Sequence, residues 1–353
     1  MTNSILSGTP ESWTRLPVQT LFSLSKPELD SLQLHWAQTR FQQLQERIPA
    51  LDALAEKQGV KIIADFETLA TILFTHHVYK NYPFAFIERK LFTELTRWLN
   101  KLTAHDLSSL DMRGVNTIDE WLTRLDEAGM FVFHSTGTSG KLSFFPRSQT
   151  EKEVWVEGTY TFLEAFMPGI RNLRLPVFWP AYRSGRQASM RLITHFGPAL
   201  AGSEAEYHSL FNAPMSADFM SLAMRMKHAQ EHGDLTAMDT IKAIFKTKGE
   251  IVTLKARKAG LTKSFFDKMV REYRGRRVFL MASATDLLDV AVEGLAAGQE
   301  RVFASDSVLL TGGGFKGRQT ISDWKDILKK FYGVDQVFMS YGMTELNTYN
   351  IAC

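Results

Sequence analysis

Apolar residues in the first third of the chain recur at the intervals of an amphipathic helix. Beyond Ser25 they fall at Leu34, Phe41, Leu44 and Ile48, with spacings of seven, three and four residues. Ser25 and Glu28 have the spacing of a capping box, so a helix is expected to begin there. The same periodicity predicts helices at about 65–79, 86–100 and 117–128. We therefore expect residues 1–129 to form a helical region packed on the core.

The pattern changes at Met130, where short apolar runs begin to alternate with helical patterns. Strands are predicted at Met130–Phe133, Leu173–Trp179, Val278–Met281, Val308–Leu310 and Gln336–Met339. Helices are predicted at about 149–166, 217–231, 238–247, 263–274 and 285–297. Alternation of this kind implies a mainly parallel sheet with helices on both faces. The predicted fold class is α/β, with residues 130–353 as the α/β core.

The clearest unit of this core is the last one. A strand that ends at Thr311 is followed by Gly312–Gly314, where the chain is expected to turn. An apolar helical stripe then runs from Trp324 to Phe331, and Gly333 is typical of a helix end. A second strand follows, so the segment is predicted to be a βαβ unit.

Composition and charge narrow the class of protein. The 353 residues carry a net charge of +3, too small for a nucleic-acid-binding surface. No apolar stretch has the roughly 18 residues of a membrane span, and the first ten residues lack the apolar segment of a signal peptide. One cysteine, Cys353, excludes internal disulfides and favours a reducing compartment. We expect a cytoplasmic protein with no nucleic-acid partner and no membrane span.

A loop close behind the Met130–Phe133 strand is rich in small polar residues and reads Ser135-Thr-Gly-Thr-Ser-Gly-Lys141. Glycines let the backbone approach a polyphosphate, consecutive amides bind its oxygens, and lysine offsets its charge. A flexible surface loop has the same composition, and composition alone does not decide between the two. A Walker P-loop is disfavoured, because Ser135 stands where that motif has glycine and Leu142 where it has serine or threonine.

Two further loops directly follow predicted strands, and all three loops are expected to lie at the same edge of a mostly parallel sheet. Ser340-Tyr-Gly-Met-Thr-Glu345 offers hydroxyls and a carboxylate beyond a strand end, where ligands of open α/β sheets collect. Mg²⁺ usually takes one or two protein carboxylates together with phosphate oxygens, although Glu345 alone also fits a solvated loop acid. Gly312–Gly314 fits either a tight turn or a surface that admits a flat ring against the backbone.

Together, these three loops resemble the adenylate-forming (ANL) superfamily of acyl-CoA synthetases, firefly-type luciferases and peptide-synthetase adenylation domains. STGTSGK at Ser135–Lys141 is similar to the family's phosphate-binding signature, and YGMTE at Tyr341–Glu345 to its second signature. They occur in the family's order, with a glycine turn about 30 residues before YGMTE. The resemblance covers about Phe131 to Glu345. TGGGFKG at Thr311–Gly317 resembles the acyl-protein synthetase and phenylacetate-CoA-ligase-like group.

The resemblance implies an acid–thiol ligase that uses ATP and Mg²⁺ to convert a fatty or aromatic carboxylic acid to an acyl-adenylate. The phosphates would be held by Ser135, Thr136, Gly137, Thr138, Ser139, Gly140 and Lys141. Adenine would lie between Gly312, Gly313 and Gly314 and the ring of Tyr341, with Gly342 and Met343 continuing the nucleotide-binding loop. Thr344 would contact the α-phosphate and Glu345 would bind Mg²⁺, so Thr344, Glu345 and Lys141 are the expected catalytic residues.

The resemblance leaves the acid pocket and the acceptor less defined. The family's pocket wall comes from the segment between the signatures, where His195, Phe196 and Gly197 are the candidates. The thiol acceptor would belong to coenzyme A, a carrier protein or a protein cysteine. Family members continue past YGMTE into a small domain with a catalytic lysine, whereas this sequence ends eight residues after Glu345. The chain is therefore expected to be incomplete as an enzyme, and the alternative is a nucleotide-binding or interaction module without turnover.

Overall fold

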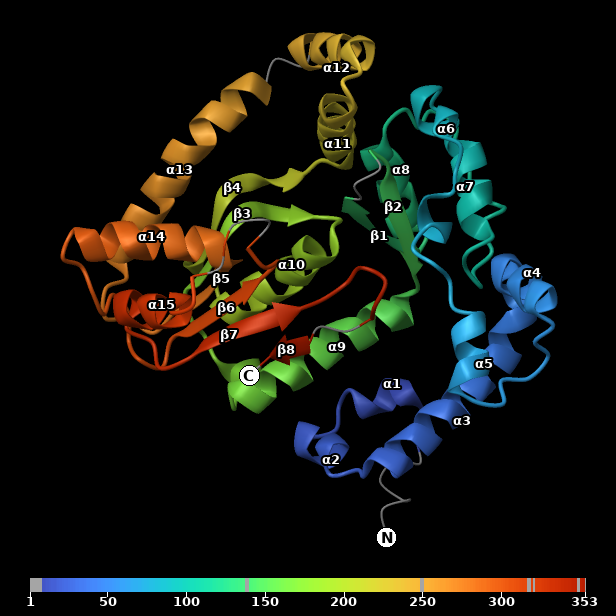
Figure 1. Cartoon of the computed structure of the whole chain (residues 1–353), viewed down its shortest axis with the longest axis horizontal. Helices are drawn as coiled ribbons and strands as arrows, with labels where there is room; N and C mark the ends of the chain where they lie inside the picture. Colours follow the sequence, from blue (N-terminus) through green and yellow to red (C-terminus); the bar gives the residue numbers. More distant parts are fainter. Residues whose placement is uncertain are drawn as a thin grey trace. The chain divides into compact units, whose positions relative to one another are not determined.

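The computed structural model describes residues 8–136, 140–247, 251–315, 319, 321–347 and 350–352. The chain divides into two units by its internal contacts (Figure 1). The first unit comprises Met1–Thr161 and Ser216–His228, and the second comprises Phe162–Met215 and Ala229–Cys353. Helices α9 (Gln149–Phe166) and α11 (Ala217–His232) each contribute residues to both units.

The first unit is mostly helical, as the sequence predicts. Besides parts of α9 and α11, its helices are α1 (Pro10–Trp13), α2 (Val18–Phe22), α3 (Lys26–Leu44), α4 (Pro49–Gln58), α5 (Phe66–Thr71), α6 (Ala85–Glu88), α7 (Phe92–Asn100) and α8 (Ile118–Glu127). The Ser25 amide donates to Glu28 Oε2 at 2.9 Å, which confirms the expected start of α3. A complete capping box begins α8, because the Glu120 amide donates to Thr117 Oγ1 and the Thr117 amide donates to Glu120 Oε2.

Strand β1 (Phe131–Thr136) does not belong to the parallel sheet. It pairs antiparallel with β2 (Leu142–Arg147), with Thr136 opposite Leu142, in a separate two-stranded sheet. Val132, Leu142 and Phe144 share an apolar cluster with residues of α7 and α8, including Trp121. The prediction that the Ser135–Lys141 loop leaves the same sheet as the other two loops is therefore wrong. The chain after this loop returns as a strand beside β1 instead of crossing over a sheet through a helix.

The boundaries of the two units differ from the boundary expected between residues 129 and 130. Besides the hairpin, Ser216–His228 joins the first unit, where two aspartates cap each other's helices. The Asp218 carboxylate accepts hydrogen bonds from the amides of Ile118 and Asp119 at the start of α8, at 3.0 and 2.9 Å. Asp119 in turn accepts from the Ala217 amide at 2.9 Å, at the start of α11. Burial raises the pKa of Asp218, so this reciprocal cap holds two acids close together inside the unit.

The second unit contains a six-stranded sheet in the order β4-β3-β5-β6-β7-β8. Its strands are β3 (Val177–Gly185), β4 (Tyr207–Met215), β5 (Phe279–Ser283), β6 (Val308–Gly312), β7 (Val337–Tyr341) and β8 (Asn350–Ala352). The first five in this order run parallel, and β8 pairs antiparallel with β7. The predicted α/β class, with a mainly parallel sheet and a helical N-terminal region, is confirmed.

Helices cover both faces of this sheet, which explains why the central strands β5 and β6 are apolar along most of their length. Besides α11, the helices that follow β3 are α10 (Ala188–Ala201), α12 (Leu235–Thr247), α13 (Ile251–Glu272), α14 (Ala284–Ala296) and α15 (Trp324–Tyr332). On one face Leu280 and Leu309 lie in a buried cluster with side chains of α13, α14 and α15. On the other, α10 packs on β3, and Phe166 of α9 meets Phe338 edge-on with ring centroids 5.5 Å apart (Figure 1).

Several boundaries differ from the sequence prediction. The sequence does not predict β2, β4 or β8, and β3 begins at Val177, after the Leu173–Leu175 segment expected to be its start. The predicted helix at 86–100 is two helices, α6 and α7, separated where Lys90 takes a left-handed φ of 56°. The predicted helix at 65–79 is shorter, since α5 ends at Thr71. In the part of the chain that the structure describes, no helix combines the length and apolar character needed to cross a bilayer.

The expected βαβ unit is confirmed in β6, α15 and β7. The turn at Gly333, between α15 and β7, leaves no space for a side chain. Gly333 follows α15 with φ 79°, and its amide donates to the Lys329 carbonyl at 2.8 Å. A Cβ at this position would lie 2.8 Å from the Arg301 Cα and 3.0 Å from the Phe303 carbonyl oxygen. Both obstacles are backbone atoms, so this turn requires glycine for two separate reasons.

We predict that Gly333→Ala lowers the free energy of unfolding by about 2–4 kcal/mol, because left-handed strain and overlap with the backbone add together. Gly275→Ala is the matched control, because Gly275 has φ 72° but no heavy atom within 4 Å of its Cβ position. Only the strain of about 1–2 kcal/mol applies there. Denaturant unfolding followed by circular dichroism measures both variants. Equal losses would show that the approach of residues 301–303 does not constrain the turn.

Candidate functional site

Three parallel strands of the second unit end at one level. Ser283 at the end of β5 lies opposite Gly312 at the end of β6, and Gly312 lies opposite Ser340 near the end of β7. The segments that follow β6 and β7 therefore leave the sheet from the same edge (Figure 1). The prediction that Gly312–Gly314 and Tyr341–Glu345 lie at the same edge of a parallel sheet is therefore confirmed.

Gly312 and Ser340 approach each other closely at this edge. A Cβ on Gly312 would lie 2.8 Å from Ser340 Oγ and 3.4 Å from the Ser340 carbonyl oxygen. Ser340 Oγ is held in place, because it donates a hydrogen bond of 3.0 Å to the Thr311 carbonyl. Strand packing therefore favours glycine at this position independently of any ligand, because a Cβ would have to displace the Ser340 hydroxyl.

The next two glycines turn the chain away from the sheet. Gly313 and Gly314 are exposed and have left-handed φ values of 78° and 58°. No heavy atom lies within 4 Å of the position that a Cβ would take on Gly314. Phe315 then packs edge-on against Trp324, with centroids 5.3 Å apart, which fixes the far end of this turn to α15. The result is a stretch of open backbone beside a fixed strand end.

The loop after β7 combines an exposed aromatic ring with a hydroxyl and a carboxylate. Tyr341 is 59% exposed and Met343 is 42% exposed, with Gly342 exposed between them. The Leu346 amide donates to the Met343 carbonyl at 3.1 Å, which closes a turn around Thr344 and Glu345. Both of these side chains are half-buried. One short turn thus carries the two polar groups expected to serve a phosphate and its metal.

The Ser135–Lys141 loop belongs to the first unit. Ser135 and Thr136 are the last residues of β1, and Gly137, Thr138 and Ser139 lie outside the described residues. Gly140 is buried with φ 70°, and a Cβ there would lie 3.2 Å from the His228 Cβ on α11. This glycine therefore permits α11 to pack against the β1–β2 connection.

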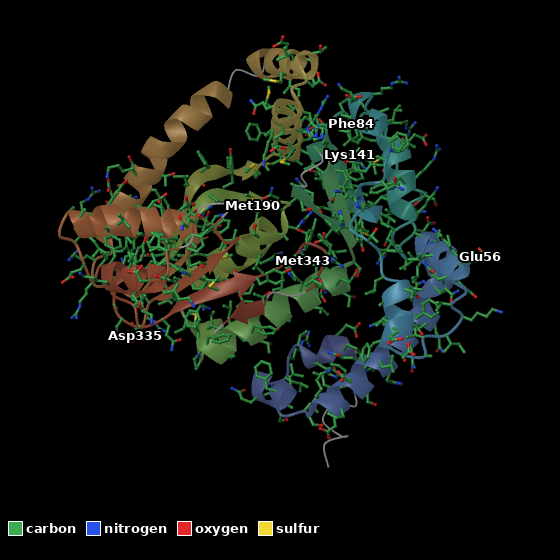
Figure 2. The ribbon with its side chains drawn as sticks, in the orientation of Figure 1. Glu56, Phe84, Lys141, Met190, Asp335 and Met343 are labelled. Carbon is green, nitrogen blue, oxygen red and sulfur yellow. The ribbon has the colours of Figure 1, made fainter. Side chains whose placement is uncertain are left out.

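Lys141 is held by the backbone of its own unit. Its Nζ donates to the Tyr82 carbonyl at 2.7 Å, makes a longer contact of 3.5 Å with the Lys80 carbonyl, and lies 5.0 Å from the centroid of the Tyr82 ring. Tyr82 is itself buried and donates its hydroxyl proton to the Leu142 carbonyl at 2.9 Å. Burial, and then the charge of Lys80, lower the pKa of Lys141. Lys141 ties the hairpin to the segment before Phe84 (Figure 2).

His195, Phe196 and Gly197 lie on α10, which packs against β3. Phe196 is 3% exposed, and a Cβ on Gly197 would lie 2.6 Å from the Tyr207 ring, so both pack between helix and sheet. His195 is exposed. α10 packs on β3 and β4, and β5 separates these two strands from β6. The assignment of His195, Phe196 and Gly197 to an acid pocket stays a prediction.

Two residues that contact the predicted loops could not be identified from the sequence pattern. Tyr82 precedes Lys141 by 59 residues and lies outside every motif, and only the fold brings its carbonyl to the lysine. Ser340 is part of a motif, but its contact with Gly312 depends on the register of β6 and β7. Neither partner could be found without tertiary pairing.

The β6 and β7 loops together offer open backbone, an exposed ring, a hydroxyl and a carboxylate at one sheet edge, a set that suits a flat, charged ligand with a bound cation. Comparison with models of known protein families finds no match for this chain, and comparison with curated proteins finds none either. The function therefore has to be argued from these residues themselves.

We predict that Gly312→Ala destabilises the protein by about 1–3 kcal/mol, because the new methyl group displaces the Ser340 hydroxyl. In a Ser340→Ala background the obstacle at 2.8 Å is absent, and the same substitution should cost at least about 0.5–1 kcal/mol less. The four proteins of this double-mutant cycle are compared by urea unfolding. Additive effects would mean that the two residues are not in contact.

Proposed function

We propose that this chain binds ATP with Mg²⁺ and activates a carboxylic acid as an acyl-adenylate, for transfer to a thiol acceptor. One observation carries the proposal: the TGGG and YGMTE strings follow neighbouring parallel strands, with Gly312 opposite Ser340. Ligands of open α/β sheets bind beyond the carboxyl ends of strands. The resemblance of both strings to the adenylate-forming superfamily supports the choice of ligand.

The residues at this edge fit a nucleotide base. The backbone at Gly313 and Gly314 is exposed, and a ring the size of adenine needs such an open, flat approach. The exposed Tyr341 ring offers a stacking surface. Within the described residues, the Thr311 hydroxyl oxygen beside this edge is buried and makes no hydrogen bond, which is uncommon.

The turn at Thr344 and Glu345 supplies the polar groups of the reaction. In the proposal the Thr344 hydroxyl donates to the α-phosphate, and the Glu345 carboxylate holds Mg²⁺, which neutralises charge on the phosphates. A carboxylate oxygen of the acid forms a bond to the α-phosphorus, the bond to the bridging oxygen breaks, and pyrophosphate leaves with its electron pair. No protein nucleophile is needed, so positioning and charge compensation carry the catalysis.

A nucleotide-binding module without turnover is the second candidate, and the contacts of Lys141 favour it. The resemblance assigns the β- and γ-phosphates to Ser135–Lys141. A lysine that stabilises a transferring phosphoryl group has to present its N–H donors to that group. In this structure Lys141 Nζ donates at 2.7 Å to the Tyr82 carbonyl, which is the contact of a structural tie.

The substitution Glu345→Gln tests whether this carboxylate contributes to the reaction or to the stability of the fold. We predict that the substitution lowers ATP–pyrophosphate exchange at least tenfold, or about 1.4 kcal/mol in the barrier. It should change the free energy of unfolding by no more than about 1 kcal/mol, because the side chain is only half-buried. A panel of fatty and aromatic acids serves as substrates at saturating Mg²⁺. Glu293→Gln, an exposed acid on α14, is the matched control.

The outcomes distinguish the two candidates. Exchange with at least one acid, lost in Glu345→Gln and kept in Glu293→Gln, supports the ligase. Calorimetric binding of Mg·ATP that depends on Glu345, without exchange for any acid, supports the binding module. Exchange that Glu345→Gln leaves unchanged contradicts the role given to this carboxylate.

A further inference from the structure

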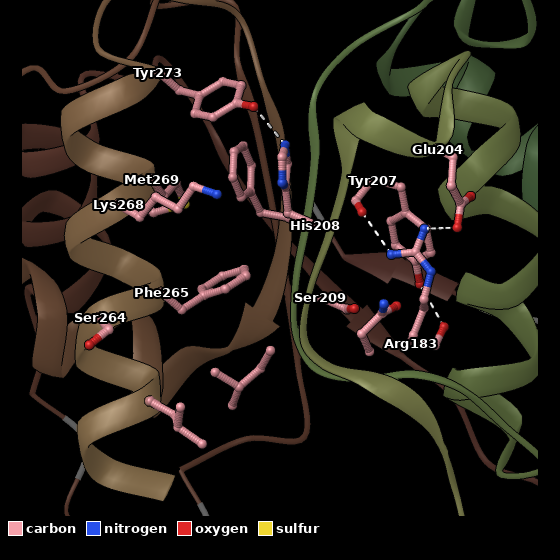
Figure 3. A pocket seen from close by; sticks show the side chains of 14 residues that line it. Arg183, Glu204, Tyr207, His208, Ser209, Ser264, Phe265, Lys268, Met269 and Tyr273 are labelled. Atoms are coloured by element: carbon pink, nitrogen blue, oxygen red, sulfur yellow. Dashed lines mark hydrogen bonds and ion pairs between the residues drawn. The ribbon is translucent and has the colours of Figure 1, made fainter. Parts of the chain in front are cut away.

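A cavity of about 450 Å³ lies between the edge strand β4 and helix α13, entirely within the second unit. Its size is within the range of about 300–1,000 Å³ that small-molecule sites occupy. We call it the β4 pocket and define it by Phe178, Arg183, Glu204, Tyr207, His208, Ser209, Leu210, Asn212, Leu261, Ser264, Phe265, Lys268, Met269 and Tyr273. Figure 3 shows these side chains. The motifs of the proposed ligase do not include any of them.

The wall on the α13 face is aromatic and apolar. Phe178 is 2% exposed and meets Tyr273 and Phe265 edge-on, with centroids 4.9 and 6.1 Å apart. Met269 is fully buried beneath them. Packed rings of this kind hold their positions without a ligand, so the wall is preformed.

Two polar side chains face the same wall. The imidazole of His208 stacks on Phe178 at 4.8 Å, and its Nε2 shares a hydrogen bond of 2.7 Å with the Tyr273 hydroxyl. Lys268 projects from α13 toward His208 (Figure 3). The only carboxylate that pairs with Lys268 in the described part of the chain is Glu272, at 3.9 Å, and both side chains are more than 40% exposed. An exposed pair at that distance is worth little, so the lysine charge remains available to a ligand.

The other charges of the pocket compensate each other on the opposite face of β4. Successive residues of a strand point to opposite faces, and Arg183 and Tyr207 lie across the ribbon from His208 (Figure 3). Arg183 pairs with Glu204, donates to the Tyr207 carbonyl at 2.8 Å and covers the Tyr207 ring at 4.2 Å. Among the lining residues Lys268 thus carries the one weakly compensated charge, and it is positive.

The β4 pocket is separate from the loops after β6 and β7. In the strand order β4-β3-β5-β6, β4 and β6 are three spacings apart, or roughly 14 Å at about 4.8 Å per strand. A carboxylate bound beside His208 on β4 is then too far from the β6 and β7 loops to react there.

From this geometry we infer that the β4 pocket binds an apolar monocarboxylate at a second site, with the carboxylate at Lys268 and His208 and the aliphatic or aromatic body against Phe178, Phe265 and Met269. The inference does not depend on the proposed ligase activity. A neutral ligand of the same shape would gain the apolar contacts but not the charge-assisted hydrogen bond to Lys268.

His208 gives this site a pH dependence. Burial lowers the pKa of His208 below its ordinary 6.5; Lys268 and Arg183 lower it further, whereas Glu206 and Glu272 raise it. The imidazole is therefore mostly neutral at pH 7.5, and a bound carboxylate would favour its protonated form. Carboxylate binding should strengthen as pH falls from 7.5 toward 5.5, because protonation then adds a second positive charge.

The test is isothermal titration of decanoate into the whole chain at pH 7.5, without ATP or Mg²⁺ and below the micelle concentration of the ligand. We expect saturable binding that Lys268→Met weakens by about tenfold or more, because the charge is lost at nearly constant side-chain volume. Decanamide binding should not change in this variant. Lys263→Met is the matched control, since Lys263 is exposed on the same helix but does not line the pocket.

Two further variants test the apolar wall and the separation of the sites. Phe265→Ala should weaken decanoate and decanamide alike. Glu345→Gln should leave decanoate binding unchanged even if it abolishes pyrophosphate exchange. Absence of decanoate binding, equal effects of Lys268→Met and Lys263→Met, or loss of decanoate binding in Glu345→Gln would overturn the inference.

Discussion

The parallel pairing of β5, β6 and β7 is the constraint on which the candidate site depends. Their backbone hydrogen bonds place Ser283, Gly312 and Ser340 at one level, so the two following loops must leave the sheet together. The same pairing brings Ser340 Oγ so close to residue 312 that a side chain there would have to displace this hydroxyl. One register thus accounts for the position of the loops and for the first glycine of the TGGG string. A ligand would meet an edge already fixed by the sheet.

The first unit is organised by a different interaction. Asp119 and Asp218 each cap the helix that carries the other, and this joins Ser216–His228 to helices a hundred residues earlier. Two carboxylates are tolerated side by side because backbone amides and a hydroxyl donate to them. The β1–β2 hairpin packs in the same unit, and Lys141 donates to the Tyr82 carbonyl within it. Leu142 and Lys141, which follow the serine- and glycine-rich segment, are therefore held by contacts within the first unit.

Strand β4 shows how the pleat of an edge strand separates two environments. Tyr207 faces Arg183 and Glu204, whose charges compensate each other. The next residue, His208, faces Phe178, Tyr273 and the side chain of Lys268. Tyr207 thus contacts a structural ion pair on one face of β4, and His208 lines an apolar pocket with a single cation on the other face. The alternation of a strand is sufficient to keep these two chemistries apart.

The sequence by itself determined the features that depend on near neighbours. The capping box at Ser25 and Glu28, the helix at 149–166 and the glycine that ends α15 follow from spacings of a few residues. The alternation of apolar runs with helical patterns was likewise sufficient for the α/β class. Only the tertiary structure decided which strands pair. Leu142–Arg147 is short and apolar, and nothing local distinguishes a strand that returns beside β1 from a segment that crosses a sheet. The partners of Lys141, Gly312 and His208 lie 28 to 65 residues away and meet them only through such pairing, because contact across a fold depends on register and packing rather than on distance along the chain.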